Sequence, residues 1–121
     1  MKIKLISFGF NWGIPKEVSF IVDCRGILNP SRIRGLNALR GTDSIVMDRV
    51  LAAPATKHVL RYIQNTIKIR DEEGHEGVTI GVACSQGHHR SVAIVEEAAR
   101  ILRLNGHQVQ ILHRDINRRE K

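Results

Sequence analysis

The feature that most constrains the fold of this chain is a strand–loop–helix pattern from Val78 to Leu104. Val78–Ala83 is a short apolar run rich in β-branched residues, which predicts a buried strand of a parallel sheet. Ser91–Leu104 places apolar residues on one helical face and charged residues on the other, and Gly106 stands where a C-terminal cap belongs. The segment Cys84–Arg90 therefore joins the end of a strand to the start of a helix.

This loop predicts an anion-binding site. A tight loop that leads into a helix directs several backbone N–H groups, and the positive end of the helix dipole, at one point. The loop also carries hydroxyl groups, two imidazoles and a guanidinium, which together suit a phosphate or a carboxylate. The expected anion-binding residues of the loop are Cys84, Ser85, Gln86, Gly87, His88, His89, Arg90 and Ser91.

The same loop has a catalytic interpretation. Cys84 and Arg90 have C-x5-R spacing, which resembles the signature loop of cysteine-dependent phosphatases and, more loosely, that of the rhodaneses. In such an enzyme Cys84 is the nucleophile, Arg90 holds the phosphate, and His89 or Asp115 moves protons. Those phosphatases usually carry His at the position of Ala83, and no acid loop is evident. A third interpretation makes Cys84 only a small buried residue at a strand end.

Residue type alone allows a metal site. Cys84, His88, His89 and His113 are all potential metal ligands. Adjacent histidines point in different directions, so the sequence predicts neither a metal site nor a cofactor.

Charge is the compositional property that bears on function. The chain has 121 residues and a formal net charge of +7, with ordinary hydrophobic and charged fractions of 42% and 26%. One domain over residues 1–121 is expected. The charge favours a polyanionic partner, nucleic acid before an anionic membrane surface, with a merely solubilising surface as the alternative. Only 4% of residues are aromatic, which disfavours a base-stacking platform.

Location follows from what the sequence lacks. No apolar run approaches a membrane span, and the N-terminus has no signal-peptide pattern. Cys24 and Cys84 form neither a C-x-x-C pair nor a disulfide framework. A cytoplasmic protein without a membrane partner is therefore expected.

The remaining elements complete an α/β pattern. The fold class predicted is a single α/β domain with a mixed or mostly parallel sheet flanked by helices and an anion-binding strand–loop–helix. Phe10 and Trp12 are expected to plug the edge of the core. Asp23 and Arg25, at a strand end, are either part of a site or an internal ion pair. The other expected strands are Lys2–Phe8, Ser19–Cys24 and Gln108–His113, and the other expected helices are Ser44–Leu51 and Ala55–Arg70.

A set of short motifs carries a family resemblance over nearly the whole chain. They are Ser7-Phe8-Gly9-Phe10 with Gly13-Ile14-Pro15, Asp23-Cys24-Arg25 with Asn29-Pro30, Arg40-Gly41-Thr42-Asp43, the Cys84–Ser91 loop, and His113-Arg114-Asp115. In this order they resemble the C-terminal domain of the RNase adapter protein RapZ and its YvcJ-type relatives. The resemblance implies a regulatory, oligomeric RNA-binding module that also holds a sugar phosphate or similar anion and contacts a protein partner.

The resemblance also defines the remaining site residues and two departures. Asn29 and Ser31 join the expected anion site, although position 31 is often His in the family. Gln86 replaces a glycine of the family loop, which usually reads close to Cys-Thr-Gly-Gly-x-His-Arg-Ser. The P-loop pattern of the family's nucleotide-binding half does not occur in this sequence.

The expected RNA contacts, taken from two basic stretches, are Arg32, Arg34, Arg40, Arg114, Arg118 and Arg119.

Overall fold

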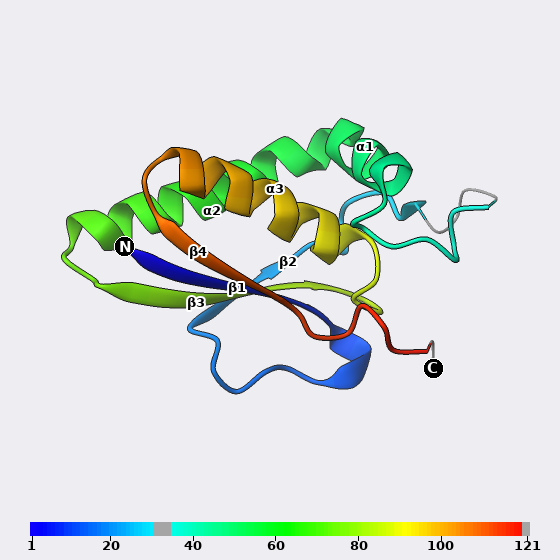
Figure 1. The fold of residues 1–121 in the computed structure, drawn as a ribbon, viewed down its shortest axis with the longest axis horizontal. Helices are drawn as coiled ribbons and strands as arrows, with labels where there is room; N and C mark the ends of the chain where they lie inside the picture. Colours follow the sequence, from blue (N-terminus) through cyan, green and yellow to red (C-terminus); the bar gives the residue numbers. More distant parts are fainter. Residues whose placement is uncertain (31–34, 120–121) are drawn as a thin grey trace.

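Four parallel strands form one sheet in the computed structural model, which describes residues 1–30 and 35–119 (Figure 1). The strand order is β2-β3-β1-β4, so β1 and β3 are central. Every pairing within the sheet is parallel, and β1 pairs with both β3 and β4. The strands are β1 (Lys2–Gly9), β2 (Phe20–Asp23), β3 (Gly77–Cys84) and β4 (Gln108–His113).

The helices lie together on one face of this sheet (Figure 1). They are α1 (Ser44–Ala52), α2 (Pro54–Glu72) and α3 (Arg90–Leu104). α3 packs across β3, β1 and β4, while α1 and α2 pack against α3. Its apolar stripe is fully buried, and Gly106 ends the helix with a positive φ of 91°. The core therefore lies between the sheet and the helices, where alternate residues such as Leu5 and Ile80 meet the helical layer.

The opposite face of the sheet is covered near the strand ends by the segment after β1. Phe8 points to this face and lies across β3, where a Cβ at Gly81 would come within 2.7 Å of the Phe8 ring. A short 3-10 helix, η1 (Phe10–Trp12), follows β1 directly. The rings of Phe8 and Phe10 meet edge to face, with centroids 5.6 Å apart. Phe10 therefore covers the core edge as expected, and it does so at the edge of the sheet where the β3–α3 loop lies.

The predicted fold class is confirmed, and the sheet is wholly parallel. The predicted strands and helices correspond to the observed ones, with ends that differ by at most two residues. In residues 1–30 and 35–119, no helix is both long and apolar enough to cross a membrane.

Candidate anion-binding site

The loop between β3 and α3 packs against the end of β1. Gly87 has a φ of 80°, a left-handed conformation that suits glycine. A side chain there would also collide with β1, because a Cβ on Gly87 would lie 2.6 Å from the Gly9 nitrogen. Gly9 is equally tight, since its Cβ would lie 2.4 Å from the carbonyl carbon of Gln86. Two facing glycines thus let the loop lie directly on the strand end.

A small cavity of about 30 Å³ lies inside this loop. Its walls include most of the residues that the sequence predicts for an anion site. Of the other predicted residues, Gly87 faces β1, Ser91 contacts Cys84, and Ser31 lies outside the described residues. The lining residues are Asn29, Cys84, Ser85, Gln86, His88, His89 and Arg90. Anion binding itself stays a prediction.

Arg90 is the cationic wall of the cavity. It is the first residue of α3, and its side chain is buried. Its Nη1 donates hydrogen bonds to the carbonyl oxygens of Arg25, at 3.0 Å, and Ile27, at 3.2 Å. These bonds fix the guanidinium between the loop and the turn that follows β2. Arg90 therefore combines a position suited to an anion with a structural role that the sequence did not predict.

The two histidines of the loop are buried and lie edge to face, with ring centroids 6.0 Å apart. His89 Nε2 donates a hydrogen bond of 2.6 Å to the Leu39 carbonyl. Burial lowers the pKa of His89 below its ordinary value, and the opposing effect of the Leu39 carbonyl is smaller. His89 is therefore neutral at neutral pH, and Arg90 brings a positive charge to the cavity wall.

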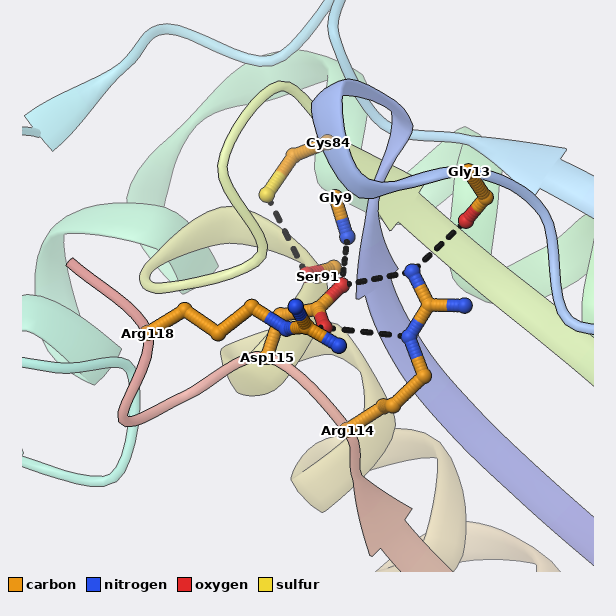
Figure 2. Close-up of polar contacts among 7 residues, drawn as sticks. All are labelled: Gly9, Gly13, Cys84, Ser91, Arg114, Asp115 and Arg118. Atoms are coloured by element: carbon orange, nitrogen blue, oxygen red, sulfur yellow. Dashed lines mark hydrogen bonds and ion pairs between the residues drawn. The ribbon is translucent and has the colours of Figure 1, made fainter. Parts of the chain in front are cut away.

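The thiol of Cys84 is buried at the end of β3. Its Sγ lies 3.1 Å from Oγ of Ser91, in the first turn of α3 (Figure 2). This contact links the strand and helix on either side of the loop. It also places the thiol at the cavity wall with Arg90, the residue that begins the helix, which is the arrangement that the catalytic interpretation requires. The binding interpretation depends on the loop's backbone and does not need the thiol.

Asp115 is the polar centre next to the loop (Figure 2). Its carboxylate is fully buried and accepts hydrogen bonds from the Gly9 amide, at 2.8 Å, and from the guanidinium groups of Arg114 and Arg118. Burial by itself would raise the pKa of Asp115, but the bonds from Arg114 and Gly9 hold it below its ordinary value. Asp115 is thus ionised at neutral pH and holds the C-terminal turn against the end of β1.

The arginines predicted to contact RNA differ in how exposed their side chains are and in how many hydrogen bonds they already make. Arg40 Nε donates to the Ile116 carbonyl at 2.7 Å, and its Nη1 donates to the Leu39 carbonyl. Arg114 binds both Asp115 and the Gly13 carbonyl. Arg118 also pairs with Asp115 but stays half exposed, and Arg119 is exposed. Arg32 and Arg34 lie outside the described residues.

Two further groups belong to this edge of the sheet. Asp23 and Arg25 form an exposed ion pair of 2.8 Å, and the Arg25 guanidinium lies over the Phe10 ring. His113, which the sequence suggested as a metal ligand and as part of a family motif, joins β4 to β1 and α3. Its Nδ1 lies 2.7 Å from Ser7 Oγ on β1, and its Nε2 lies 3.1 Å from a carboxylate oxygen of Glu96 on α3. In the sequence, the family motifs that contain Ser7 and His113 pointed to these two residues. Nothing in the sequence pointed to Glu96.

No group of three or more His, Cys, Asp or Glu residues within the described ranges is arranged to hold a metal ion. The residues that suggested such a site have other contacts. Cys84 meets Ser91, His89 meets the Leu39 carbonyl, and His113 meets Ser7.

Comparison with known proteins covers nearly the whole chain. A family model described as the RapZ C-terminal domain matches residues 1–117. A protein named nucleotide-binding protein from Corynebacterium aurimucosum is 41% identical over 121 residues, which are 96% of this chain and 41% of the relative. Another from Desulforapulum autotrophicum is 41% identical over 125 residues, covering 100% of this chain and 43% of the relative. The chain thus spans about two fifths of the length of these curated relatives.

Proposed function

Because the chain belongs to the RapZ C-terminal domain family, we propose that it is an RNA-binding module whose Cys84–Ser91 loop holds a phosphate group. The phosphate is that of the RNA or of a phosphorylated small molecule such as a sugar phosphate. The observation that carries this proposal is the cavity at the start of α3, which has a buried arginine in its wall. The net charge of +7 supports a polyanionic partner.

The chemistry of the cavity favours an oxyanion over other ligands. The positive end of the α3 dipole and the Arg90 guanidinium both favour negative charge at this point. Ser85 and Gln86 supply neutral polar groups in the wall. A volume of about 30 Å³ admits little more than the oxyanion itself, so the rest of the ligand must lie outside.

The names of the relatives are consistent with this proposal at a coarser level. Both relatives are named as nucleotide-binding proteins. Since this chain covers only about two fifths of each, that name describes a protein with a further part. We therefore propose for this chain the binding of phosphate-bearing ligands, and the relatives' names add nothing more specific.

A cysteine-dependent phosphatase is the second candidate, and the position of the Cys84 thiol in the cavity wall favours it. Such a reaction transfers the phosphoryl group to the thiolate while an acid protonates the leaving oxygen. The groups suggested for proton transfer do not suit that role. Asp115 is ionised and accepts four hydrogen bonds from Gly9, Arg114 and Arg118, and His89 donates its Nε2 proton to a backbone carbonyl.

Two measurements on wild type and Cys84→Ser test the proposal. Inorganic phosphate, added at matched ionic strength, should raise the melting temperature of both proteins, because a serine hydroxyl can replace the thiol in its contact with Ser91. Neither protein should hydrolyse a generic aryl phosphate. Hydrolysis by wild type that Cys84→Ser abolishes would establish the phosphatase instead. Absence of phosphate stabilisation in wild type would remove the loop as the anion site.

A further inference from the structure

Three arginines at this edge of the sheet share one arrangement: each binds a carboxylate, and the guanidinium carbon of each lies over an aromatic ring. Arg25 binds Asp23 through Nε and Nη2, and its Cζ lies 4.2 Å from the Phe10 ring centroid. Arg118 binds Asp115, and its Cζ lies 4.9 Å from the Trp12 centroid. Arg114 also binds Asp115, at 5.4 Å from the Phe8 centroid. The members of this arginine–aromatic cluster are Phe8, Phe10, Trp12, Arg25, Arg114 and Arg118.

The arginine–aromatic cluster is continuous. The rings of Phe8 and Phe10 contact each other, and Arg114 and Arg118 share one carboxylate (Figure 2). The side chain of Arg25 is 52% exposed and that of Arg118 is 47% exposed, whereas that of Arg114 is only 23% exposed. About half of the Arg25 and Arg118 side chains is therefore exposed to solvent, while a ring and a carboxylate contact each of them.

The cluster adjoins the cavity through direct hydrogen bonds. The Asn11 amide, in the middle of η1, donates to the Ser85 carbonyl at 3.1 Å. Arg90 donates to the carbonyl of Arg25 at 3.0 Å. A hydrogen bond thus joins Arg90 of the cavity wall to Arg25 of the Arg25–Phe10 stack, so one ligand can reach both.

We propose that the Arg25–Phe10 and Arg118–Trp12 stacks take unpaired bases of the same RNA strand whose phosphate lies in the Cys84–Ser91 loop. This proposal rests on the RNA-binding function proposed above and specifies the form of RNA that is bound. Nucleobases stack on guanidinium planes and aromatic rings whatever their sequence, since every base has a π face. Bases in a duplex are already stacked on each other, so the cluster selects single-stranded segments.

The carboxylates hold the two guanidinium groups in position. Asp23 accepts from Nε and Nη2 of Arg25, and Asp115 accepts from Nε of Arg118. The proposed contact is between the base and the guanidinium face, and such stacking does not distinguish among bases. Because both guanidinium groups are held in position before binding, less side-chain freedom is lost when a base stacks.

Fluorescence of Trp12, the single tryptophan of the chain, measures base binding at the cluster directly. An oligouridylate of about eight nucleotides and an abasic oligomer of the same length carry similar phosphate charge but differ in bases. The oligouridylate should quench Trp12 fluorescence and bind about tenfold or more tightly than the abasic oligomer. A duplex of the same length should bind less tightly than the oligouridylate, although it carries more phosphate charge.

Substitutions locate the effect. Arg25→Lys keeps the charge and loses the planar group, and Phe10→Leu removes the ring beneath it. Each should reduce the preference for the oligouridylate over the abasic oligomer severalfold. Arg100→Lys is the matched control, because Arg100 is 61% exposed, pairs with Glu97, and lies about 15 Å along α3 from Arg90. It should leave the preference unchanged.

The outcomes separate this inference from the proposed function. Equal, salt-sensitive binding of both oligomers by wild type would overturn the stacking inference and leave RNA binding standing. An unchanged preference in both Arg25→Lys and Phe10→Leu would also overturn it. If neither oligomer binds wild type, the RNA-binding function fails and the stacking inference fails with it.

Discussion

Arg90 combines a proposed role in anion binding with a structural role. As a cationic wall of the cavity it suits a bound anion, and as a donor to the Arg25 and Ile27 carbonyls it holds the turn after β2. Its burial makes the second role important, because a buried carbonyl that loses its donor destabilises the fold. Substitution at this position should therefore change both ligand affinity and stability.

We expect Arg90→Lys to weaken phosphate binding and Arg90→Ala to weaken it by about tenfold to a hundredfold, the effect of losing a charge-assisted hydrogen bond. Without phosphate, Arg90→Ala should also lower the free energy of unfolding by about 2–3 kcal/mol, because two carbonyls lose their donor. Urea denaturation with and without phosphate measures both quantities. Arg61→Ala, at an exposed position of α2, is the control. Equal phosphate stabilisation of wild type and Arg90→Ala would contradict the anion site.

Asp115 contributes through its ionised form. Its pKa is lowered in the folded state, so its contribution is present above the unfolded pKa of about 3.9 and is lost as the pH falls through the folded value. The carboxylate connects β1 to the C-terminal turn, so its protonation releases two segments that are far apart in the sequence.

For Asp115→Asn we expect the free energy of unfolding at pH 7 to fall by on the order of 1–3 kcal/mol. The difference from wild type should shrink as the pH falls below about 4. Thermal or urea unfolding across pH 3–7 tests this expectation. Asp23, whose pKa its bond to Arg25 also lowers, is present in both proteins and cancels in the difference. A difference that stays constant with pH would show that Asp115 acts through packing alone.

At the scale of the elements, the end of β1 sets the position of the loop. Gly9 has ordinary extended backbone angles, with φ at −104°, so its importance comes from space and not from conformation. The Gln86 carbonyl group occupies the place where a side chain would lie. The close contact of β1 and the loop also brings the Gly9 amide within reach of Asp115.

Gly9→Ala should therefore lower the free energy of unfolding by at least about 1–3 kcal/mol, because the added methyl group collides with backbone that cannot turn away. It should also reduce stabilisation by phosphate, since the loop must move. Gly26→Ala is the matched control, because no atom lies within 4 Å of its added Cβ. Melting curves of the two variants, with and without phosphate, make the comparison. A Gly9→Ala protein as stable as wild type would show that the loop is easily displaced.

At the scale of the whole molecule, the net charge is +7, but the cationic side chains differ in how accessible they are to a polyanion. Arg40 and Arg114 donate hydrogen bonds to backbone carbonyls, whereas the side chains of Arg118 and Arg119 are exposed to solvent. Affinity for RNA should come from exposed cations, since each contact with a phosphate releases a bound counterion.

RNA affinity should accordingly fall steeply between dilute and physiological salt. Arg119→Ala should weaken binding of all sequences and flatten the slope of log affinity against log salt by about 0.7–1. Arg40→Ala should leave that slope nearly unchanged and lower the melting temperature instead, because it releases the Ile116 carbonyl. Fluorescence anisotropy with a labelled single strand over a salt series tests both. RNA binding that does not respond to salt would contradict an electrostatic interface.

Local sequence determined the elements and the loop. Hydrophobic periodicity placed β3 and α3, and Gly87 with Arg90 marked the segment between them, because strand and helix patterns depend on neighbouring residues. The same signals located the cavity residues from Cys84 to Arg90, which are consecutive apart from Gly87. Anion binding by these residues stays a prediction.

Only the tertiary structure decided which distant groups surround the loop and which arginines remain available. Gly9 and Asp115 are 106 positions apart, yet they bind each other because the carboxyl ends of parallel strands meet at one edge of the sheet. The low aromatic content argued against a stacking platform, but folding gathers Phe8, Phe10 and Trp12 beside three arginines. Composition gives only the number of aromatic and arginine residues. Which of them contact each other, and which arginines are held by carbonyls or carboxylates, depends on segments that only the folded chain brings together.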